Sequence, residues 1–512
     1  MCGIYGEFFP NRKLSSKADF LKHNDFNLNR GPDMSGYWSD KKNIQLGFRR
    51  LSILDLSESG NQPMLSNNNR YAMVFNGEIY NFLKLKEELI NKGYSFSSQG
   101  DSEVLVNYFE CFGLQKTLDQ IDGMFAIALY DIVNNDLTLI RDFAGIKPLH
   151  YSKTNENIVF GSRYDQIAKH NLSINSLIDK EVLKTYLRMH YVPAPYGILE
   201  DTFQLEPGQY ITFKSDGTFS SKKYWQFPEI KEEQLITNKK EALNLLKVEL
   251  EKAVKDQMIS DVPLGAFLSG GIDSPLIVNA AKKNKKDVKA FSIGSDSKKH
   301  DESEDAKKYA ELIGVDFHLK KMKSFDAMHI IKDCMNNFQE PFADFSLIPT
   351  YQLTINASKE FTVMLSGDGG DELFFGYERF NSVGKNLKYR WLPGFLRYPI
   401  YGIDKLLFKH KHINSCVLNE ELADSHKNLH SRVTNNELNL VFPNLKNEKE
   451  KTIDCYNYSE NNSEFKFYND MRNAEFYGMM QKTLTKVDRM SMANSLEVRV
   501  PFLQKSFINA AV

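Results

Sequence analysis

The sequence lacks an excess of charge of either sign. Its 65 lysine and arginine residues nearly cancel its 66 aspartate and glutamate residues, which leaves a formal net charge of −1. A protein that attracts nucleic acid or an anionic membrane through its overall field needs a strong positive excess. We therefore expect small-molecule partners, with no nucleic acid and no membrane among them.

Long apolar runs are also missing. No run approaches the roughly 20 apolar residues that cross a bilayer, and the first residues do not have the basic-then-apolar pattern of a secretory signal. We expect a cytoplasmic protein. The 512 residues, 42% hydrophobic and 26% charged, are typical of a globular chain long enough for two or more domains.

Paired cysteines are absent as well. The five cysteines are scattered, odd in number and form no C-x-x-C pair, which excludes the spacing of a disulfide framework or a zinc site. They are Cys2, Cys111, Cys334, Cys416 and Cys455. We expect the last four to be buried thiols, and we treat Cys2 as a candidate nucleophile.

The pattern of apolar and polar residues changes clearly at one point along the chain. Residues 1–170 contain many short apolar segments separated by turn signals, which predict an antiparallel, β-rich domain with one helix near 81–93. Prolines, glycines and aromatic residues at 191–228 indicate a connecting region. Residues 409–464, rich in Asn, Lys and Glu, are interpreted as helical surface or an insertion.

The second half alternates between strand and helix patterns. Leu243, Leu246 and Leu250 form one apolar face in 239–258, which predicts a helix. The elements that follow are a strand at 262–268, a helix from Ser274, a strand at 288–293, a helix at 303–314, a strand at 315–319 and a strand beginning at 361. This order predicts an α/β domain with a parallel sheet.

Two of these predicted strands end in glycine-rich turns, SGGIDS (269–274) and LSGDGGDE (365–372). Glycine lets backbone N–H groups approach an oxyanion at the start of a helix, and Ser274 is a candidate cap for a helix whose first residue is Pro275. Neither turn continues into the G-K-[ST] of a Walker motif. If the strands are parallel, the two turns meet at one edge, where Asp273 and Asp371 can share the magnesium of a bound polyphosphate.

The same stretches resemble a known family. SGGIDS is similar to the pyrophosphate loop of ATP pyrophosphatases, and LSGDGGDE, EPFADFSLIPT and LTKVDRMSMANSLEVRVPFL resemble the synthetase domain of glutamine-hydrolysing asparagine synthetases. MCGIYG, RGPD, RRLSILD, FNGEIYN, GDSEVL, GMFAIALYD and RDFAGIKPL resemble that family's glutaminase domain. The resemblance covers nearly the whole chain.

The resemblance implies two domains and one coupled reaction. An α+β glutaminase domain at 2–190, with stacked antiparallel sheets of the N-terminal nucleophile hydrolase type, is followed by a linker region at 191–235. An α/β ATP-pyrophosphatase domain with a parallel sheet occupies 236–512. Glutamine would supply ammonia. ATP would adenylate the side-chain carboxylate of aspartate with release of pyrophosphate, and ammonia would then displace AMP.

In the first domain the resemblance implies a cysteine nucleophile. After removal of Met1 the α-amine of Cys2 can take the proton of its own thiol. Asn76 and Gly77 would donate hydrogen bonds to the oxyanion. The remaining residues implied to bind glutamine are Arg50 for the carboxylate, Asp101 for the ammonium group, and Leu51, Ile53 and Glu78.

In the second domain the resemblance implies ATP and Mg²⁺ as cofactors. The residues implied to bind ATP are Leu268, Ser269, Gly270, Gly271, Asp273, Ser274, Ile293, Ser366 and Gly367. Asp368 is assigned to acyl-adenylate formation, and Asp273 and Asp371 to the metal. An apolar passage for ammonia and a homodimer are also implied.

The sequence leaves two questions open: which carboxylate is the acceptor, and whether Val512 is the natural end of the chain. The motifs do not separate aspartate from another carboxylate, such as a sugar acid in surface polysaccharide synthesis, or from a glutaminase or glutamine-binding protein with an inactive second domain. Family members continue, beyond the position of Val512, through a helical segment with a basic residue facing the phosphates. The chain also departs from the family pattern at His150, Arg163, Phe375 and Gln504.

Overall fold

A computed structural model of the chain gives the arrangement of most residues. The residues described are 2–296, 301–322, 324–384, 389, 392–408, 418, 422–431, 433, 435–458 and 464–512. Cys416 lies outside them. Cys334 and Cys455 are buried, as expected, whereas Cys111 is only partly buried and corrects that expectation.

The N-terminal domain contains two six-stranded sheets in which every paired strand is antiparallel. The first has the order β10-β8-β9-β1-β3-β2 and the second β12-β11-β7-β6-β5-β4. The strands are β1 Gly3–Phe8, β2 Met34–Ser39, β3 Ile44–Arg50, β4 Met64–Leu65, β5 Tyr71–Ile79, β6 Gly123–Asp131, β7 Asp136–Arg141, β8 His150–Thr154, β9 Asn157–Gly161, β10 Thr202–Gln204, β11 Gln209–Phe213 and β12 Phe219–Lys223.

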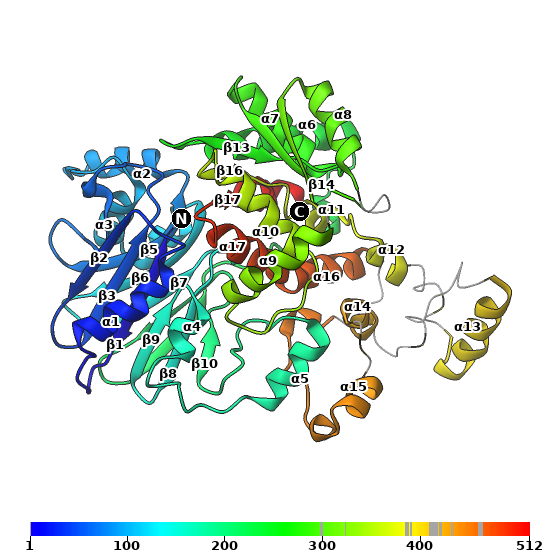
Figure 1. The fold of residues 1–512 in the computed structure, drawn as a ribbon, viewed down its shortest axis with the longest axis horizontal. Coiled ribbons are helices and arrows are strands. Elements are labelled where there is room, and N and C mark those ends of the chain that lie inside the picture. Colours follow the sequence, from blue (N-terminus) through cyan, green and yellow to red (C-terminus); the bar gives the residue numbers. More distant parts are fainter. Residues whose placement is uncertain are drawn as a thin grey trace.

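The two sheets stack face to face. Side chains from both, among them Ile4, Phe48, Val74 and Ala128, form one buried cluster between them. Helices α1 Lys17–Asn24 and α4 Tyr164–Ala168 cover the outer face of the first sheet, and α2 Phe82–Ile90 and α3 Asp101–Gln120 cover that of the second. The predicted stacked antiparallel domain is therefore confirmed as a four-layer α-β-β-α arrangement (Figure 1).

The prediction of a single helix in this domain is wrong. The expected helix near 81–93 is α2, but α1 and α3 also form, and α5 Lys180–Met189 follows. Helix α3 is buried on all sides from Asp101 to Phe109. It therefore has no polar stripe, and the helical period that reveals a half-buried helix is missing from its sequence.

Strands also form inside the expected connecting region 191–235. Strand β10 pairs with β8, and β11 pairs with β7, so residues 202–223 extend both N-terminal sheets. Ile211 and Phe213 alternate with less buried residues along β11 and pack into the cluster between the sheets. This alternation is the signature of a half-buried strand.

The C-terminal domain is built on a five-stranded parallel sheet of order β15-β14-β13-β16-β17. Its strands are β13 Leu264–Phe267, β14 Lys289–Ser295, β15 Asp316–Met322, β16 Val363–Leu365 and β17 Glu497–Arg499. The predicted α/β domain is confirmed.

Helices cover both faces of this sheet. Helices α6 Lys239–Asp256, α7 Asp273–Asn284, α8 Ser303–Ile313 and α18 Lys505–Ala511 lie on one side, and α10 Leu347–Ala357 and α17 Met479–Met492 on the other. The remaining helices are α9 Ser324–Asn337, α11 Gly370–Phe374, α12 Glu378–Gly384, α13 Gly394–Phe408, α14 Leu422–His430, α15 Asn435–Val441 and α16 Glu464–Tyr477.

One hydrophobic core joins the two domains. Leu51, Ile53 and Met124 of the N-terminal domain belong to the same buried cluster as Leu268 and Leu503 of the C-terminal domain. The domains are therefore packed against each other through apolar side chains, not only tethered by the chain (Figure 1).

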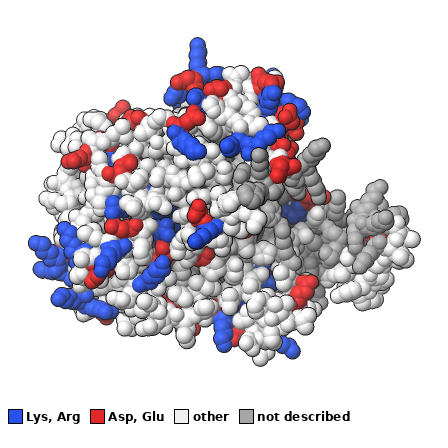
Figure 2. Space-filling model, viewed as in Figure 1, with Lys and Arg blue, Asp and Glu red and all other residues white. Residues whose placement is uncertain are grey.

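The outer surface carries mixed charge. On the face in Figure 2, Lys and Arg side chains are interspersed with Asp and Glu side chains over much of the described surface. Among the described helices, none has both the length and the apolar composition required to cross a membrane.

Candidate active sites

Cys2 lies in the middle of the first sheet, immediately before β1. Its thiol sulfur lies 3.9 Å from the Leu51 carbonyl oxygen, and its backbone nitrogen donates to Asn76 Oδ1 at 3.0 Å. Its carbonyl oxygen accepts a hydrogen bond from Arg30 Nε at 3.2 Å. Burial raises the pKa of the thiol, so a nearby base is needed to form the reactive thiolate.

Asn76 and Gly77 stand beside Cys2 on β5. Asn76 Nδ2 is buried, and the described residues offer it no hydrogen-bond acceptor. A Cβ on Gly77 would lie 1.9 Å from the Met124 carbonyl oxygen, so this position admits no side chain. A buried amide donor without a partner costs free energy unless a ligand oxygen completes it.

The residues predicted to bind glutamine come together. Cys2, Arg50, Leu51, Ile53, Gly77, Glu78 and Asp101 all line one small cavity. Its volume of about 30 Å³ is room for little more than a water molecule. An amino acid can therefore enter only if lining side chains or the adjoining 50–60 segment move.

Two buried charges in this cavity have no ionic partner among the residues described. The Arg50 guanidinium donates to the carbonyl oxygens of Ser57 at 2.6 Å and Leu54 at 3.2 Å, and also to that of Asp55. Asp101 Oδ2 accepts from the Ile79 backbone nitrogen at 2.8 Å, and burial raises the pKa of its carboxyl to about 6. A ligand with one carboxylate and one ammonium group would supply both missing partners.

The structure adds Arg30 to this site. Besides contacting Cys2, its guanidinium makes a two-point pair with Asp488 of α17, at 2.7 and 3.0 Å. Burial alone would raise the pKa of Asp488, but the Arg30 guanidinium helps lower it to about 2. The RGPD motif contains Arg30, but no local pattern indicates that its partner lies in α17.

The second site lies where the strand order of the parallel sheet reverses. From β13 the chain proceeds outward through β14 and β15 and then returns to β16 on the opposite side of β13. The carboxyl ends of β13 and β16 therefore border a crevice of the kind in which ligands of open α/β sheets bind. A cleft of about 1260 Å³ opens there.

The two glycine turns touch in this cleft. A Cβ on Gly367 would lie 2.8 Å from the Ser274 backbone nitrogen, and one on Gly370 would lie 2.4 Å from Asp273 Cγ. The predicted cap is corrected: α7 begins at Asp273 after Ile272, and Ser274 lies within its first turn. The Ser274 hydroxyl instead accepts from the Ser269 backbone nitrogen at 2.8 Å, which holds the turn against the helix.

Three carboxylates gather at the turns. Burial, together with the charges of Asp371 and Asp368, raises the pKa of Asp273 to about 6. Burial also raises the pKa of Asp371, and Ser366 Oγ donates to Asp368 Oδ2 at 2.6 Å. Like charges this close favour binding of a cation.

Most residues predicted for this site line the cleft. They are Leu268, Ser269, Gly271, Asp273, Ser274, Ile293, Ser366, Gly367, Asp368 and Asp371. Gly270 does not line it, and a Cβ there would lie 2.9 Å from Glu302 Cβ, so tight packing explains this glycine. Sequence reasoning missed Thr350, Tyr377, Thr483, Lys486 and Phe502 as lining residues.

Comparisons with known proteins cover both sites. The model of the glutamine amidotransferase domain family matches residues 1–225, and that of the asparagine synthase family matches residues 245–512. Asparagine synthetase [glutamine-hydrolyzing] 1 of Bacillus subtilis is 32% identical over 526 residues, covering 100% of this chain and 80% of that protein. Putative asparagine synthetase [glutamine-hydrolyzing] 2 of Methanocaldococcus jannaschii is 31% identical over 536 residues, covering 98% and 100%.

A solved structure is only distantly similar. Glutamine phosphoribosylpyrophosphate amidotransferase from B. subtilis is 15% identical, covers 62% of this chain and 65% of that chain, and has a TM-score of 0.33. The family assignment rests on the asparagine synthetases of higher identity, whose matches cover nearly the whole of this chain. Together with its paired sites they show that the chain belongs to the glutamine-hydrolysing asparagine synthetase family of carbon–nitrogen ligases.

Proposed function

We propose that the protein converts aspartate to asparagine, using ammonia released from glutamine and ATP that activates the acceptor carboxylate as an acyl-adenylate. Amidation of a carboxylate at the expense of glutamine follows from the family. Aspartate as the acceptor and the roles of individual residues are our proposal.

The first half of the reaction is cleavage of the glutamine amide. The Cys2 thiolate attacks the carboxamide carbon, with the α-amine of Cys2 taking the thiol proton once Met1 is removed. Negative charge develops on the carbonyl oxygen, where Asn76 Nδ2 and the Gly77 N–H donate to it. The α-ammonium group returns that proton to the departing nitrogen, ammonia leaves, and water then hydrolyses the thioester to glutamate.

Recognition of glutamine relies on the two unpaired charges. Arg50 binds the α-carboxylate and Asp101 the α-ammonium group, with Leu51, Ile53 and Glu78 completing the pocket. The lack of an ionic partner for Arg50 and Asp101 among the described residues supports these roles.

The second half is activation of the acceptor. The turns at 268–274 and 366–371 receive the nucleotide, with Ile293 near the adenine, Ser366 and Gly367 near AMP, and Asp368 near the acyl-adenylate. Asp273 and Asp371 fit a magnesium ion, because each has a half-buried carboxylate with a raised pKa. When bound, Mg²⁺ neutralises charge on the phosphates of ATP and pyrophosphate.

Transfer of ammonia between the sites is supported by the apolar core that they share. Leu51 and Ile53 line the Cys2 cavity, Leu268 lines the nucleotide cleft, and all three belong to one buried cluster. An apolar passage would keep ammonia neutral and away from bulk water.

The observation that carries the proposal is the meeting of the two glycine turns and three aspartates at the reversal of the parallel sheet. The test is exchange of labelled pyrophosphate into ATP with each candidate carboxylate. We expect exchange that depends on aspartate. Glutamine hydrolysis without any exchange would instead leave a glutaminase with an inactive second domain.

A second acceptor is supported by the size of the cleft. Its volume of about 1260 Å³ exceeds the roughly 300–1,000 Å³ typical of small-molecule sites. A cleft of this size has room beside the nucleotide for a larger carboxylate such as a sugar acid. Exchange stimulated by a uronic acid and not by aspartate would select this alternative.

The family resemblance also leads us to propose a cytoplasmic homodimer. Sedimentation of the purified chain and fractionation of the cells that produce it would test these two statements.

A further inference from the structure

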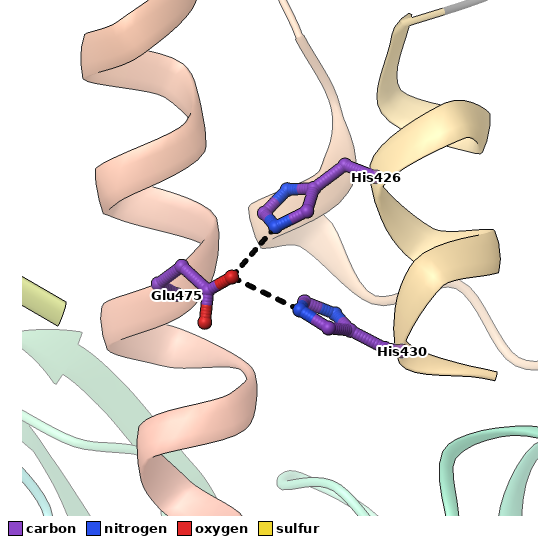
Figure 3. A group of neighbouring side chains, drawn as sticks. All are labelled: His426, His430 and Glu475. Carbon is purple, nitrogen blue, oxygen red and sulfur yellow. Dashed lines mark hydrogen bonds and ion pairs between the residues drawn. The ribbon is translucent and has the colours of Figure 1, made fainter. Parts of the chain in front are cut away.

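A buried cluster beyond the nucleotide cleft brings two histidines onto one carboxylate. His426 and His430 lie one turn apart on α14, and their Nε2 atoms lie 2.7 and 3.0 Å from Glu475 Oε1 on α16 (Figure 3). The side chains are 0%, 1% and 0% exposed, respectively. Among the described residues, these three form a group able to hold a metal ion.

The neighbours of this cluster favour a hydrogen-bonded network over a metal. Tyr456 Oη lies 2.6 Å from His430 Nδ1, and the Tyr458 hydroxyl contacts His426 Nδ1. A tyrosine hydroxyl that donates to Nδ1 leaves the proton of the neutral imidazole on Nε2, which then donates to Glu475. In that tautomer neither Nε2 has a lone pair for a metal.

Arg379 supplies the counter-charge to Glu475. Its Nη2 donates to Oε2 at 2.5 Å, and its Nε donates to Oε1. Burial opposes ionisation of Glu475, but the arginine and the two imidazoles hold its pKa well below the usual range. The carboxylate is therefore ionised, fully hydrogen-bonded and already paired with a cation.

The paired arginine stands at the edge of the nucleotide cleft. Arg379 Cζ lies 3.6 Å from the centre of the Tyr377 ring, and Tyr377 lines the cleft. Burial raises the pKa of Asp371, and the charge of Arg379 partly offsets this rise, which is consistent with a guanidinium near the acidic turn. Nε and Nη2 bind Glu475, which leaves Nη1 outside that pair.

Lys247, Lys283 and Lys486 are the cations that line the cleft among the described residues, and two of them contact other side chains. Lys283 pairs with Glu251 at 2.5 Å, and Lys486 donates to Ser346 Oγ at 3.0 Å on the α17 side. Pyrophosphate is a polyanion, and a planar guanidinium held by one carboxylate can still offer its free edge to a phosphoryl oxygen.

Building on the proposed function, we infer that Arg379 binds a phosphoryl oxygen of ATP and of the leaving pyrophosphate, and that Glu475, with His426 and His430, positions its guanidinium. Arg379 is the binding residue, and the other three act through it. The cluster therefore extends the phosphate site into a part of the chain where no sequence motif pointed to function.

The test compares full-length variants by calorimetric titration with Mg·pyrophosphate. We expect Arg379→Ala to weaken pyrophosphate binding about 10- to 100-fold, the loss typical of a charge-assisted hydrogen bond. Arg379→Lys should recover part of it, and Glu475→Gln should weaken binding less than Arg379→Ala. In the double variant the two effects should not add, because both act through one guanidinium. Glutaminase activity should be unchanged in each folded variant.

Arg188→Lys is the matched control. Arg188 pairs with the carboxylate of Glu450 at 3.3 Å and donates to Asn428 of α14 at 2.7 Å, so it anchors the same helix without lining the cleft. Its variant should lower thermal stability and leave pyrophosphate affinity unchanged. An equal loss of affinity in Arg188→Lys would reduce the role of the cluster to packing and overturn the inference.

Two further results would overturn it. The first is that the wild type binds pyrophosphate tightly and a folded Arg379→Ala variant binds it with the same affinity. This result would leave the proposed function intact. The second is one equivalent of zinc in the purified protein that is lost in His426→Gln, since a metal would then occupy the cluster. A wild type that binds neither ATP nor pyrophosphate would refute the proposed function itself.

Discussion

Asp101 offers a sharp test of the glutamine site, because its ionised form is costly without a ligand. The carboxylate is buried, accepts hydrogen bonds from the Ile79 backbone and the Ser102 hydroxyl, and has no cationic partner in the described structure. Asp101→Asn keeps the shape and an acceptor oxygen but removes the charge. We expect this substitution to stabilise the free protein and to impair its use of glutamine.

The size of the stability effect follows from the pKa of Asp101. Burial raises it from 3.8 to about 6, and a shift of about two pKa units corresponds to about 3 kcal/mol. The folded pKa lies above the unfolded value, so protonation favours the folded state. This contribution is complete below pH 3.8 and is lost as the pH rises through 6. Near pH 8, Asp101→Asn should therefore raise the free energy of unfolding by up to about 3 kcal/mol.

The effect on glutamine has the opposite sign. With a pKa of about 6, roughly ten Asp101 side chains are ionised for each protonated one at pH 7, and the ratio reverses at pH 5. If only the ionised form binds the ammonium group, the KM for glutamine should rise about tenfold over this interval. Synthesis supported by added ammonia bypasses the site, so at a constant concentration of free NH3 it should not show this rise.

Glutamate release measured from pH 5 to 8 checks the prediction, with thermal melting on the same samples. Asp122→Asn is the control, because burial also raises the pKa of Asp122 to about 6 although this residue lies outside the Cys2 cavity. It should leave the KM for glutamine unchanged. A KM that stays flat with pH, or that Asp101→Asn does not alter, would refute the reasoning.

Three other substitutions probe the remaining parts of the two sites. Asn76→Ala should lower the kcat of glutamine hydrolysis about 10²- to 10³-fold, because it removes an oxyanion donor. Product formation from added ammonia should persist. An equal loss of both activities would contradict this role for Asn76. Gly370→Ala places a Cβ 2.4 Å from Asp273 Cγ. It should raise the KM for ATP at least about tenfold in pyrophosphate exchange and leave glutamine hydrolysis unchanged. An unaltered KM would remove this turn from the nucleotide site. Asp488→Ala leaves Arg30 buried and unpaired. It should lower the free energy of unfolding, measured with urea, by about 3–5 kcal/mol and should also lower the glutaminase rate. If both quantities keep their wild-type values, the pair is dispensable.

Local patterns in the sequence were enough to predict the two glycine turns of the parallel sheet. The β13 turn and the β16 turn each follow a short apolar run, and parallel pairing is enough to bring such turns to one edge. Both elements were therefore expected, as was their meeting. The Ser274 cap failed because the Ser269 backbone competes for the hydroxyl, an interaction across a tight turn that no helix-start rule contains.

Features that depend on distant parts of the chain were not predictable. The buried helix α3 has no periodic stripe to reveal it. The cluster of His426, His430 and Glu475 comes from a segment whose composition indicated only surface helix or insertion, and it exists because α14 packs near α16. Arg30 and Asp488 are 458 residues apart, so their pairing depends on the relative placement of two complete domains.

Helix α17 explains why that placement matters for chemistry. Thr483, Lys486 and Val487 line the nucleotide cleft, and the next residue, Asp488, binds Arg30, which in turn holds the Cys2 carbonyl oxygen. One helix thus contacts the proposed nucleotide site on one side and holds the proposed nucleophile of the other domain on the opposite side. Because both members of the Asp488–Arg30 pair are buried, α17 cannot shift without either carrying Arg30 along or leaving two charges unpaired. The position of Cys2, the proposed nucleophile, is therefore tied to the position of one wall of the proposed nucleotide cleft.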